Sequence, residues 1–271
     1  MLLSLVRASH PEPVVGVTVA VVGLGAALGQ VGWWLVALGA AVLTGQLSVG
    51  WLNDLVDADR DARVGRGRKP VAAGEVAASA VWVAVVAAAV GTVVLSLGFG
   101  AVAGAAHILA VVVAWAYNLR LKATVFSVVP YAVSFGLLVA FVTLGLPGPY
   151  PPPWWMVATA SLLGCAAHFA NVLPDFDDDR ATGVHGLPHR LGAAGSRVAA
   201  AVLVLAASAT LVAGLPTEAV PLGVAALAVA GAVTAVGLIR GQRPRSRAAF
   251  HAMLVVAVLD VAVLIAANLP G

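Results

Sequence analysis

The feature that most constrains this chain is a succession of apolar stretches, each about 20 residues long, that fills the whole sequence. A helix needs about 20 mostly apolar residues to cross the hydrocarbon of a bilayer. In that hydrocarbon every backbone amide must find its partner within the protein, and a helix meets this need by itself. The pattern therefore predicts an all-α, polytopic membrane protein with nine transmembrane helices. We place them at 13–30, 33–53, 76–97, 100–121, 124–146, 154–174, 194–214, 217–239 and 247–268.

The composition supports a membrane-embedded chain. Only 10% of the 271 residues are charged and 61% are hydrophobic, whereas a soluble domain usually carries about 25% charged residues. Apolar stretches and short polar gaps alternate from end to end, so we expect a single membrane-embedded domain over residues 1–271. Cys165 is the only cysteine, which excludes an intrachain disulfide and argues against a thiolate zinc site.

The basic residues test the number of spans. All 15 Lys and Arg lie at the N-terminus or around the gaps after the second, fourth, sixth and eighth predicted spans. Cytoplasmic loops are enriched in Lys and Arg, so we predict a cytoplasmic N-terminus and an extracytoplasmic C-terminus. The basic residues then mark topology, and we expect no nucleic-acid partner. The abundance of Arg, Ala, Val and Gly is typical of GC-rich bacterial coding and favours a bacterial inner membrane.

Most of the acidic residues are concentrated in two clusters. The first cluster closes the second predicted span and the other closes the sixth, so both are expected on the cytoplasmic side. Together they contain eight of the 12 acidic residues: Asp54, Asp57, Asp59 and Asp61, and Asp175, Asp177, Asp178 and Asp179.

The two clusters are copies of one pattern. Four residue types recur at six positions with identical offsets, and three of these types, Asn, Asp and Pro, are scarce in this composition. We interpret the match as an internal repeat, in which the second half of the core echoes the first. The positions are Asn53, Asp57, Asp61, Gly65, Pro70 and Gly74 in one copy and Asn171, Asp175, Asp179, Gly183, Pro188 and Gly192 in the other.

If the helices continue through the clusters, a rotation of about 100° per residue sorts the side chains. Asp59 and Asp177 point away from the other acids, and Pro174 is able to kink the second helix. The shared faces carry Asn53, Asp54, Asp57 and Asp61 in the first cluster, and His168, Asn171, Asp175, Asp178 and Asp179 in the second.

Several carboxylates on one helix face repel one another unless cations stand among them. Hard divalent cations, Mg²⁺ above all, bind carboxylate and amide oxygens, and Mg²⁺ readily shares its ligands with phosphate groups. Two facing sets of carboxylates therefore predict a diphosphate site bridged by metal ions. The alternative is a pair of solvated acidic loops beside basic loops, and the matched spacing argues against it.

These motifs resemble those of the UbiA superfamily of intramembrane prenyltransferases. Asn53-Asp54-x2-Asp57-x3-Asp61 reads as the family's NDxxDxxxD motif, and Asp175-x3-Asp179 is similar to its second motif, DxxxD. The resemblance implies nine helices around a central lipid-accessible cavity, in which an isoprenyl diphosphate ionises and the prenyl group passes to an acceptor. It also implies two Mg²⁺ ions, one held by Asn53, Asp54, Asp57 and Asp61 and the other by Asp175 and Asp179. Asn171 joins the second set through the repeat.

Basic and aromatic residues extend this predicted site. Arg68 and Lys69 follow the first motif and are expected to contact the diphosphate. Many family members carry a YxxxK motif after the fourth span. Here Tyr117 and Lys122 stand one residue too far apart, with Arg120 between them, so either basic residue is a candidate for that contact.

Four residues are candidates for control of the chemistry inside the cavity. Trp51, Tyr131 and Phe135 are candidate cavity-lining residues, with core packing as the alternative for each, and an aromatic face attracts a carbocation. His168 is a candidate base, with a buried structural histidine as the alternative.

Three functions remain open from the sequence. The first is prenyl transfer to a small aromatic or lipid acceptor, with release of pyrophosphate. The second is terpene cyclisation at the same Mg²⁺-diphosphate site without an acceptor. The third is an ion-coupled transporter, because intramembrane acids also mark ion pathways. Membrane lipids are expected neighbours, and no obligate protein partner is evident.

Overall fold

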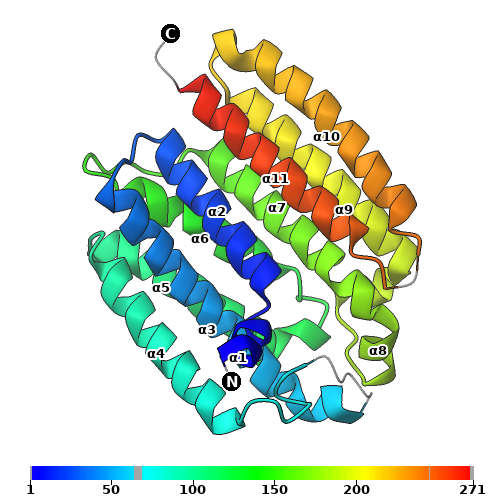
Figure 1. The fold of residues 1–271 in the computed structure, drawn as a ribbon. Helices are drawn as coiled ribbons and strands as arrows, with labels where there is room; N and C mark the ends of the chain where they lie inside the picture. The colour runs from blue at the N-terminus through cyan, green and yellow to red at the C-terminus, as the bar shows by residue number, and fades with distance from the viewer. Residues whose placement is uncertain (1, 64–68, 244, 269–271) are drawn as a thin grey trace.

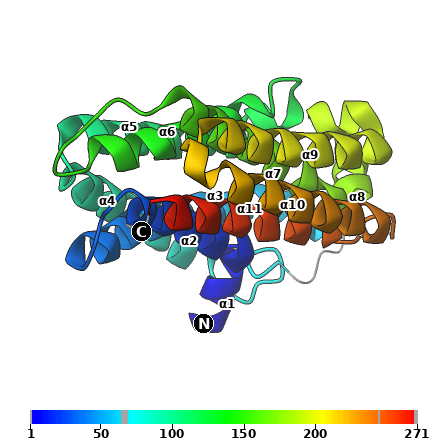
Figure 2. The same cartoon turned by 90° about the horizontal axis from the view of Figure 1, so that it is seen from above.

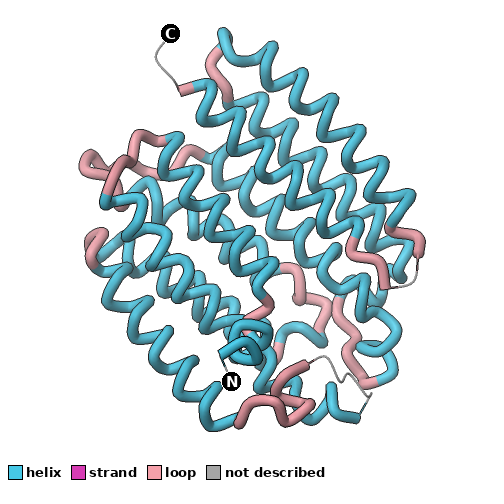
Figure 3. Tube along the Cα trace, in the orientation of Figure 1, coloured by secondary structure: helices cyan, strands magenta, loops and turns pink. Residues whose placement is uncertain are grey.

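The computed structural model describes residues 2–63, 69–243 and 245–268. Over these residues the chain is helical, with no strand (Figure 3). Three short 3-10 helices, η1 (Leu121–Ala123), η2 (Leu173–Asp175) and η3 (Thr217–Ala219), lie among the α-helices. The α-helices are α1 (Leu2–Ala8), α2 (Pro11–Ala27), α3 (Trp33–Arg63), α4 (Ala78–Leu97), α5 (Ala101–Leu119), α6 (Val129–Leu144), α7 (Trp154–Val172), α8 (Phe176–Ala181), α9 (Leu187–Gly214), α10 (Val220–Arg240) and α11 (Ala248–Ala267).

Each predicted span coincides with a helix, but the helices differ in length. Within the described residues, seven are long and apolar enough to cross a membrane: α3, α4, α5, α7 with its continuation to Ala181, α9, α10 and α11. The pair α1 and α2, bent by 69° at the break between them, forms an eighth if it counts as one span. α6 is apolar but has only 16 residues. The all-helical membrane fold is confirmed, and nine crossings remain a prediction.

Two boundaries differ most from the predicted ones, for identifiable reasons. α3 continues past residue 53 to Arg63, because the acidic motif is itself helical and extends the span beyond its apolar part. α9 begins at Leu187 rather than near 194, with Pro188 in its first turn, where a missing backbone N–H costs nothing. Gly192 interrupts α9 with φ 75° and ψ 164°, so the loop after the second motif enters the bundle through a kink.

The helices repeat in two sets of four. α3, α4, α5 and α6 form one set and lie together in Figure 1, and α7, α9, α10 and α11 form the other. α5 and α10 begin 119 residues apart, as do α6 and α11, which is within one residue of the 118 that separate the two motif copies. Gly74 and Gly192, which are equivalent in the motif pattern, both have positive φ, 70° and 75°. This agreement supports the internal repeat.

α2 lies between the two sets and contacts α3, α6 and α11. Each set has its own buried cluster, centred on Phe141 and Leu38 in the first and on Phe250 and Val256 in the second. A third cluster joins Ala27 of α2 to the second set. The outer helix α4 presents exposed valines spaced three or four residues apart, which a bilayer would cover: Val83, Val86, Val90 and Val94.

The ends of the helices that carry the acidic motifs lie at one end of the molecule. The end of α3 and the short helix α8 both lie at the bottom of Figure 1, on the same side as α1. Figure 2 shows α1 projecting from the body of the bundle beside this end. α1 is held there in part by Trp51 of α3, whose Nε1 donates a hydrogen bond of 2.8 Å to the Leu5 carbonyl.

Gly50 provides a test of this attachment. A Cβ at Gly50 would lie 2.0 Å from the carbonyl oxygen of Ser9, in the break between α1 and α2. Gly50→Ala should therefore displace the N-terminal segment and lower the free energy of unfolding by about 1–3 kcal/mol. Thermal unfolding of the detergent-purified protein measures this change.

The matched control is Gly231→Ala on α10, where a Cβ meets no atom within 4 Å. Because Ala is a better helix former than Gly, this variant should be as stable as the wild type or up to about 1 kcal/mol more stable. Equal stability of the two alanine variants would contradict the close packing at Gly50.

Candidate active site

The first motif occupies the last turns of α3. Asp54, Asp57 and Asp61 are 1%, 4% and 0% exposed, whereas Asp59 is exposed. This is the separation that the helical projection predicts, because α3 continues unbroken to Arg63. Three carboxylates are thus withdrawn from water on one helix face. Buried charges of one sign are stable only when they are paired.

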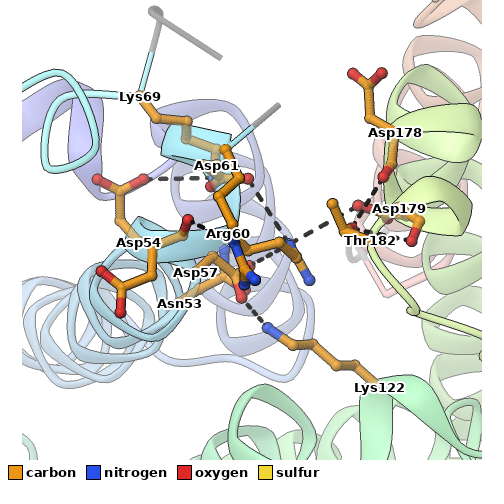
Figure 4. A network of polar contacts seen from close by, with 12 residues as sticks. Asn53, Asp54, Asp57, Arg60, Asp61, Lys69, Lys122, Asp178, Asp179 and Thr182 are labelled. Atoms are coloured by element: carbon orange, nitrogen blue, oxygen red, sulfur yellow. Dashed lines mark hydrogen bonds and ion pairs between the residues drawn. The ribbon is translucent and has the colours of Figure 1, made fainter. Parts of the chain in front are cut away.

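Among the described residues, three basic side chains pair with these carboxylates. Lys69 Nζ lies 3.4 Å from Asp54 Oδ1 and 3.6 Å from Asp61 Oδ2. Asp57 is paired with Arg60, at 2.8 Å, and with Lys122, whose Nζ donates to Asp57 Oδ1 (Figure 4). Burial lowers the pKa of Lys122, and the adjacent Asp57 carboxylate opposes this by raising it. The two lysines come from different parts of the chain and converge on one helix end.

His10, in the break between α1 and α2, also contacts this end of α3. Its Nε2 lies 3.1 Å from Lys69 Nζ and 3.4 Å from Asn53 Nδ2. Burial, assisted by the positive charges of Lys69 and Arg247, lowers the pKa of His10 to about 3. The ring is therefore neutral at physiological pH, and Nε2 is able to accept a hydrogen bond from the Lys69 ammonium.

The second motif lies on a broken helix rather than a continuous one. α7 ends at Val172, and the chain passes through the 3-10 turn η2, which contains Pro174, into α8. Pro cannot donate the backbone bond that a continuous α-helix needs. Thr182 closes α8, with its Oγ1 donating to the carbonyls of Asp178 and Asp179. Asp177 is exposed, while Asp175, Asp178 and Asp179 are partly buried.

The two motifs meet across the side chain of Arg60. Its Nη2 lies 2.8 Å from Asp57 Oδ2, 3.9 Å from Asp61 Oδ1 and 3.8 Å from Asp179 Oδ1. Figure 4 shows Asp179 on a segment that faces the end of α3. Carboxylates from both motif copies therefore lie within 4 Å of a single nitrogen atom, close enough to share a cation.

Both motifs open into one cavity of about 970 Å³. Its lining combines polar residues of the two motifs with apolar residues of α2, α6, α7 and α11. A volume of this size suits a ligand with a long hydrocarbon part. The predicted site residues among the lining are Asn53, Asp57, Lys69, Tyr117, Lys122, Tyr131, Phe135, His168, Asn171, Asp175 and Asp179.

Aromatic rings gather on the cavity wall next to the motifs. The His168 ring lies 4.8 Å from the Tyr131 ring and 5.5 Å from the Tyr117 ring, and Phe135 stacks beside Tyr131 at 6.4 Å. His168 Nε2 lies 3.0 Å from Ser127 Oγ, which accepts a hydrogen bond from the Leu187 backbone N–H. The other ring nitrogen, Nδ1, is buried without a hydrogen-bond partner among the described residues.

The structure places two predicted residues away from the site, and it does not describe a third. Of the two basic candidates after the fourth span, Lys122 reaches the first motif, whereas Arg120 is exposed at the end of α5. The indole of Trp51 is turned toward α1 rather than the cavity, because its N–H is bonded to Leu5. Arg68 lies outside the residues that the structure describes, as do Gly65 and Arg66.

The Asp and Asn side chains of the two motifs suit a hard divalent cation, because they offer carboxylate and amide oxygens as ligands. Within the described parts of the chain, no three His, Cys, Asp or Glu side chains are grouped closely enough to hold a metal ion. The spaces between the carboxylates are instead filled by Arg60, Lys69 and Lys122. The residues that would hold Mg²⁺ are those of the two motifs, once these side-chain cations give way.

Sequence reasoning missed three residues of the site. Arg60 had a signal, because it lies three residues after Asp57, at a spacing that places two side chains side by side on a helix. His189 directly follows Pro188, one of the positions shared by the two motif copies, and its Nε2 lies 3.9 Å from Asp179 Oδ2. His10 had no signal, because only the fold brings the N-terminus to α3.

The fold and the site together define a polytopic helical membrane protein with an apolar cavity that ends at two facing carboxylate motifs. The chain belongs to the UbiA prenyltransferase family, whose sequence pattern matches residues 15–258.

Solved structures share the fold over nearly the whole chain. A UbiA homolog from Aeropyrum pernix K1, in its apo form, is 21% identical, with a TM-score of 0.74 over 95% of this chain and 98% of the other. A UbiA homolog from Archaeoglobus fulgidus bound to GPP and Mg²⁺ is 16% identical, with a TM-score of 0.72 over 98% and 99%. A structure of a digeranylgeranylglyceryl phosphate synthase is 14% identical, with a TM-score of 0.67 over 98% of each chain. No curated protein matches the sequence.

Ser127 tests how the aromatic wall is held. Ser127→Ala removes the partner of His168 Nε2 and the acceptor for the Leu187 N–H at the start of α9. Loss of two buried hydrogen bonds should lower the free energy of unfolding by about 2–3 kcal/mol, as measured by thermal unfolding in detergent.

Thr210→Val is the matched control, because among the described residues the Thr210 hydroxyl bonds only to the Ala206 carbonyl of its own helix. This variant should unfold close to the wild-type temperature. If Ser127→Ala were as stable as Thr210→Val, this result would contradict the stabilising contacts of Ser127 with His168 and Leu187.

Proposed function

We propose that this protein is a Mg²⁺-dependent intramembrane prenyltransferase. In this proposal it ionises an isoprenyl diphosphate, transfers the prenyl group to a small aromatic or lipid acceptor, and releases pyrophosphate. The observation that carries the proposal is the convergence of Asp57 and Asp179, from two separate motifs, on one cation at the mouth of an apolar cavity. Membership of the UbiA family and the ligands of the Archaeoglobus fulgidus homolog, GPP and Mg²⁺, support it.

The reaction needs negative charge to be stabilised where the diphosphate departs. The bond between the allylic carbon and the diphosphate oxygen breaks, and the electron pair leaves with pyrophosphate. Mg²⁺ held by the carboxylates of the motifs would supply positive charge to the departing group. Asn53, Asp54, Asp57 and Asp61 would hold one ion, and Asn171, Asp175 and Asp179 the other. Lys69 and Lys122 would contact the diphosphate oxygens, and we assign the same role to Arg68.

The cavity wall suits the other half of the substrate. Tyr117, Tyr131 and Phe135 present aromatic faces that attract a carbocation, and the apolar lining keeps water from it. A nucleophilic carbon or oxygen of the acceptor bonds to the prenyl carbon and gives up a proton. His168 is our candidate for the base that takes this proton, because Ser127 fixes its orientation at the cavity wall.

A terpene cyclase is the second candidate. The same aromatic residues line the one sizeable cavity in the described part of the chain, and a carbocation folded there would be quenched by loss of its own proton.

An ion-coupled transporter is disfavoured by membership of the UbiA family and by the position of both acidic motifs at one end of the molecule. With the N-terminus cytoplasmic, as we propose, the motifs face the cytoplasm and take a diphosphate from that side.

The direct test is release of pyrophosphate by the purified protein from geranyl, farnesyl or geranylgeranyl diphosphate in the presence of Mg²⁺. Asp57→Ala and Asp175→Ala should each reduce the rate by about 100-fold or more, because each removes a carboxylate from the proposed metal sites. Asp59→Ala and Asp177→Ala are matched controls, since both side chains are exposed, and they should retain activity. Absence of release with all three substrates would contradict the proposal.

Analysis of the organic extract separates the two enzyme functions. A prenylated product that forms only with an added acceptor identifies a transferase. A cyclic hydrocarbon that forms without an acceptor identifies a cyclase.

A further inference from the structure

Arg60 has an unusual environment for a basic residue near a membrane surface. Its side chain is only 14% exposed and lies between the two acidic motifs (Figure 4). A single atom, Nη2, makes the contacts with Asp57, Asp61 and Asp179. A topological marker needs only a positive charge on the cytoplasmic side, so this role does not explain why Arg60 is buried.

The neighbouring Arg63 shows the difference. It lies one turn later on α3, is exposed, and bonds through Nε to the backbone carbonyl of Asp59. Both arginines satisfy the same topological pattern, yet only Arg60 reaches across to the second motif. Its position three residues after Asp57 on α3 directs its side chain between the carboxylates.

The contacts of Arg60 leave its guanidinium incompletely satisfied. Nε is buried and has no hydrogen-bond partner among the described residues. The strongest arginine–carboxylate pairs use two parallel N–H bonds to one carboxylate, whereas here one nitrogen is shared by three carboxylates. Such a pairing neutralises charge but lacks the geometry of a permanent structural ion pair. It is suited to exchange with another cation.

We propose that Arg60 is an internal counter-ion that holds the two motifs together in the metal-free protein and competes with the divalent ion for their carboxylates. The inference rests on the proposed function, because Asp57, Asp61 and Asp179 are the proposed metal ligands. A divalent ion and the guanidinium carry charge of the same sign, so binding of the ion to these oxygens displaces Arg60. Arg60 thus acts as a positioning residue for the second motif and sets the affinity of the site for metal.

The test measures metal affinity directly, without diphosphate and without turnover. Mn²⁺ is titrated into the purified full-length protein and the free ion is followed by electron paramagnetic resonance. Arg60→Gln should bind Mn²⁺ about tenfold more tightly than the wild type or better, because a cation within 4 Å of three carboxylates has been removed. Arg63→Gln, the matched control, should bind with wild-type affinity.

A second measurement tests the structural half of the proposal. In EDTA, Arg60→Gln should unfold at a lower temperature than the wild type, because the carboxylates lose a neutralising cation. Mn²⁺ should raise its unfolding temperature by more than it raises that of the wild type. Arg60→Lys keeps the positive charge on a smaller head group, so its Mn²⁺ affinity and stability should lie between those of the wild type and Arg60→Gln. This variant provides the test if Arg60→Gln does not fold.

The outcomes separate the inference from the proposed function. Failure of the wild type to bind Mn²⁺ would overturn the proposed metal site, and with it the proposed competition between Arg60 and the metal ion. Mn²⁺ binding by the wild type with equal or weaker binding by Arg60→Gln would overturn the inference alone. If Arg60→Gln does not fold and Arg60→Lys is measured in its place, wild-type Mn²⁺ affinity in Arg60→Lys would also overturn the inference.

Discussion

The structure depends on one electrostatic constraint: carboxylates buried at the end of an apolar bundle need positive charge beside them. Asp54, Asp57 and Asp61 are almost fully buried, and their charges cannot be left unpaired at low dielectric. The chain brings Arg60, Lys69 and Lys122 to them from a helix, a loop and a 3-10 turn. The end of the molecule that holds the motifs is therefore organised around cations, whether these belong to side chains or to bound metal.

The repeat explains how two such motifs come to face each other. Each four-helix set has an acidic motif at or just beyond the end of its first helix, α3 or α7. The glycine with positive φ at the matched position, Gly74 or Gly192, precedes α4 in one set and interrupts α9 in the other. Because α6 contacts α7 and α2 contacts α11, the two sets enclose a common space. Two copies of one unit thereby produce a single cavity with a carboxylate motif from each copy at its mouth.

Much of this arrangement could be predicted from the sequence, because it follows from periodicity and composition. Apolar length places the helices, the helical projection separates Asp59 from its buried neighbours, and the shared spacing reveals the repeat. Family resemblance then brings Lys69 and Lys122 into the site. These are local or repeated patterns, and a single sequence carries them plainly.

What could not be predicted depends on tertiary contact. The break at Pro174 changes the helix into a 3-10 turn, so the positions of Asp175 and Asp179 do not follow from a helical projection. His10 joins the site only because α1 bends by 69° from α2 and packs on α3. Trp51 is a predicted cavity-lining residue, yet its N–H donates a hydrogen bond to the carbonyl of Leu5 in α1.

The most direct measurement of the central claim is anomalous diffraction from crystals of the protein soaked with Mn²⁺ and a non-hydrolysable isoprenyl diphosphate analogue. We expect one anomalous peak at about 2 Å from carboxylate oxygens of the first motif, a second peak at the second motif, and the diphosphate between them. Metal bound at only one motif, or anomalous peaks away from both motifs, would contradict the claim that the two motifs bind one diphosphate through metal ions.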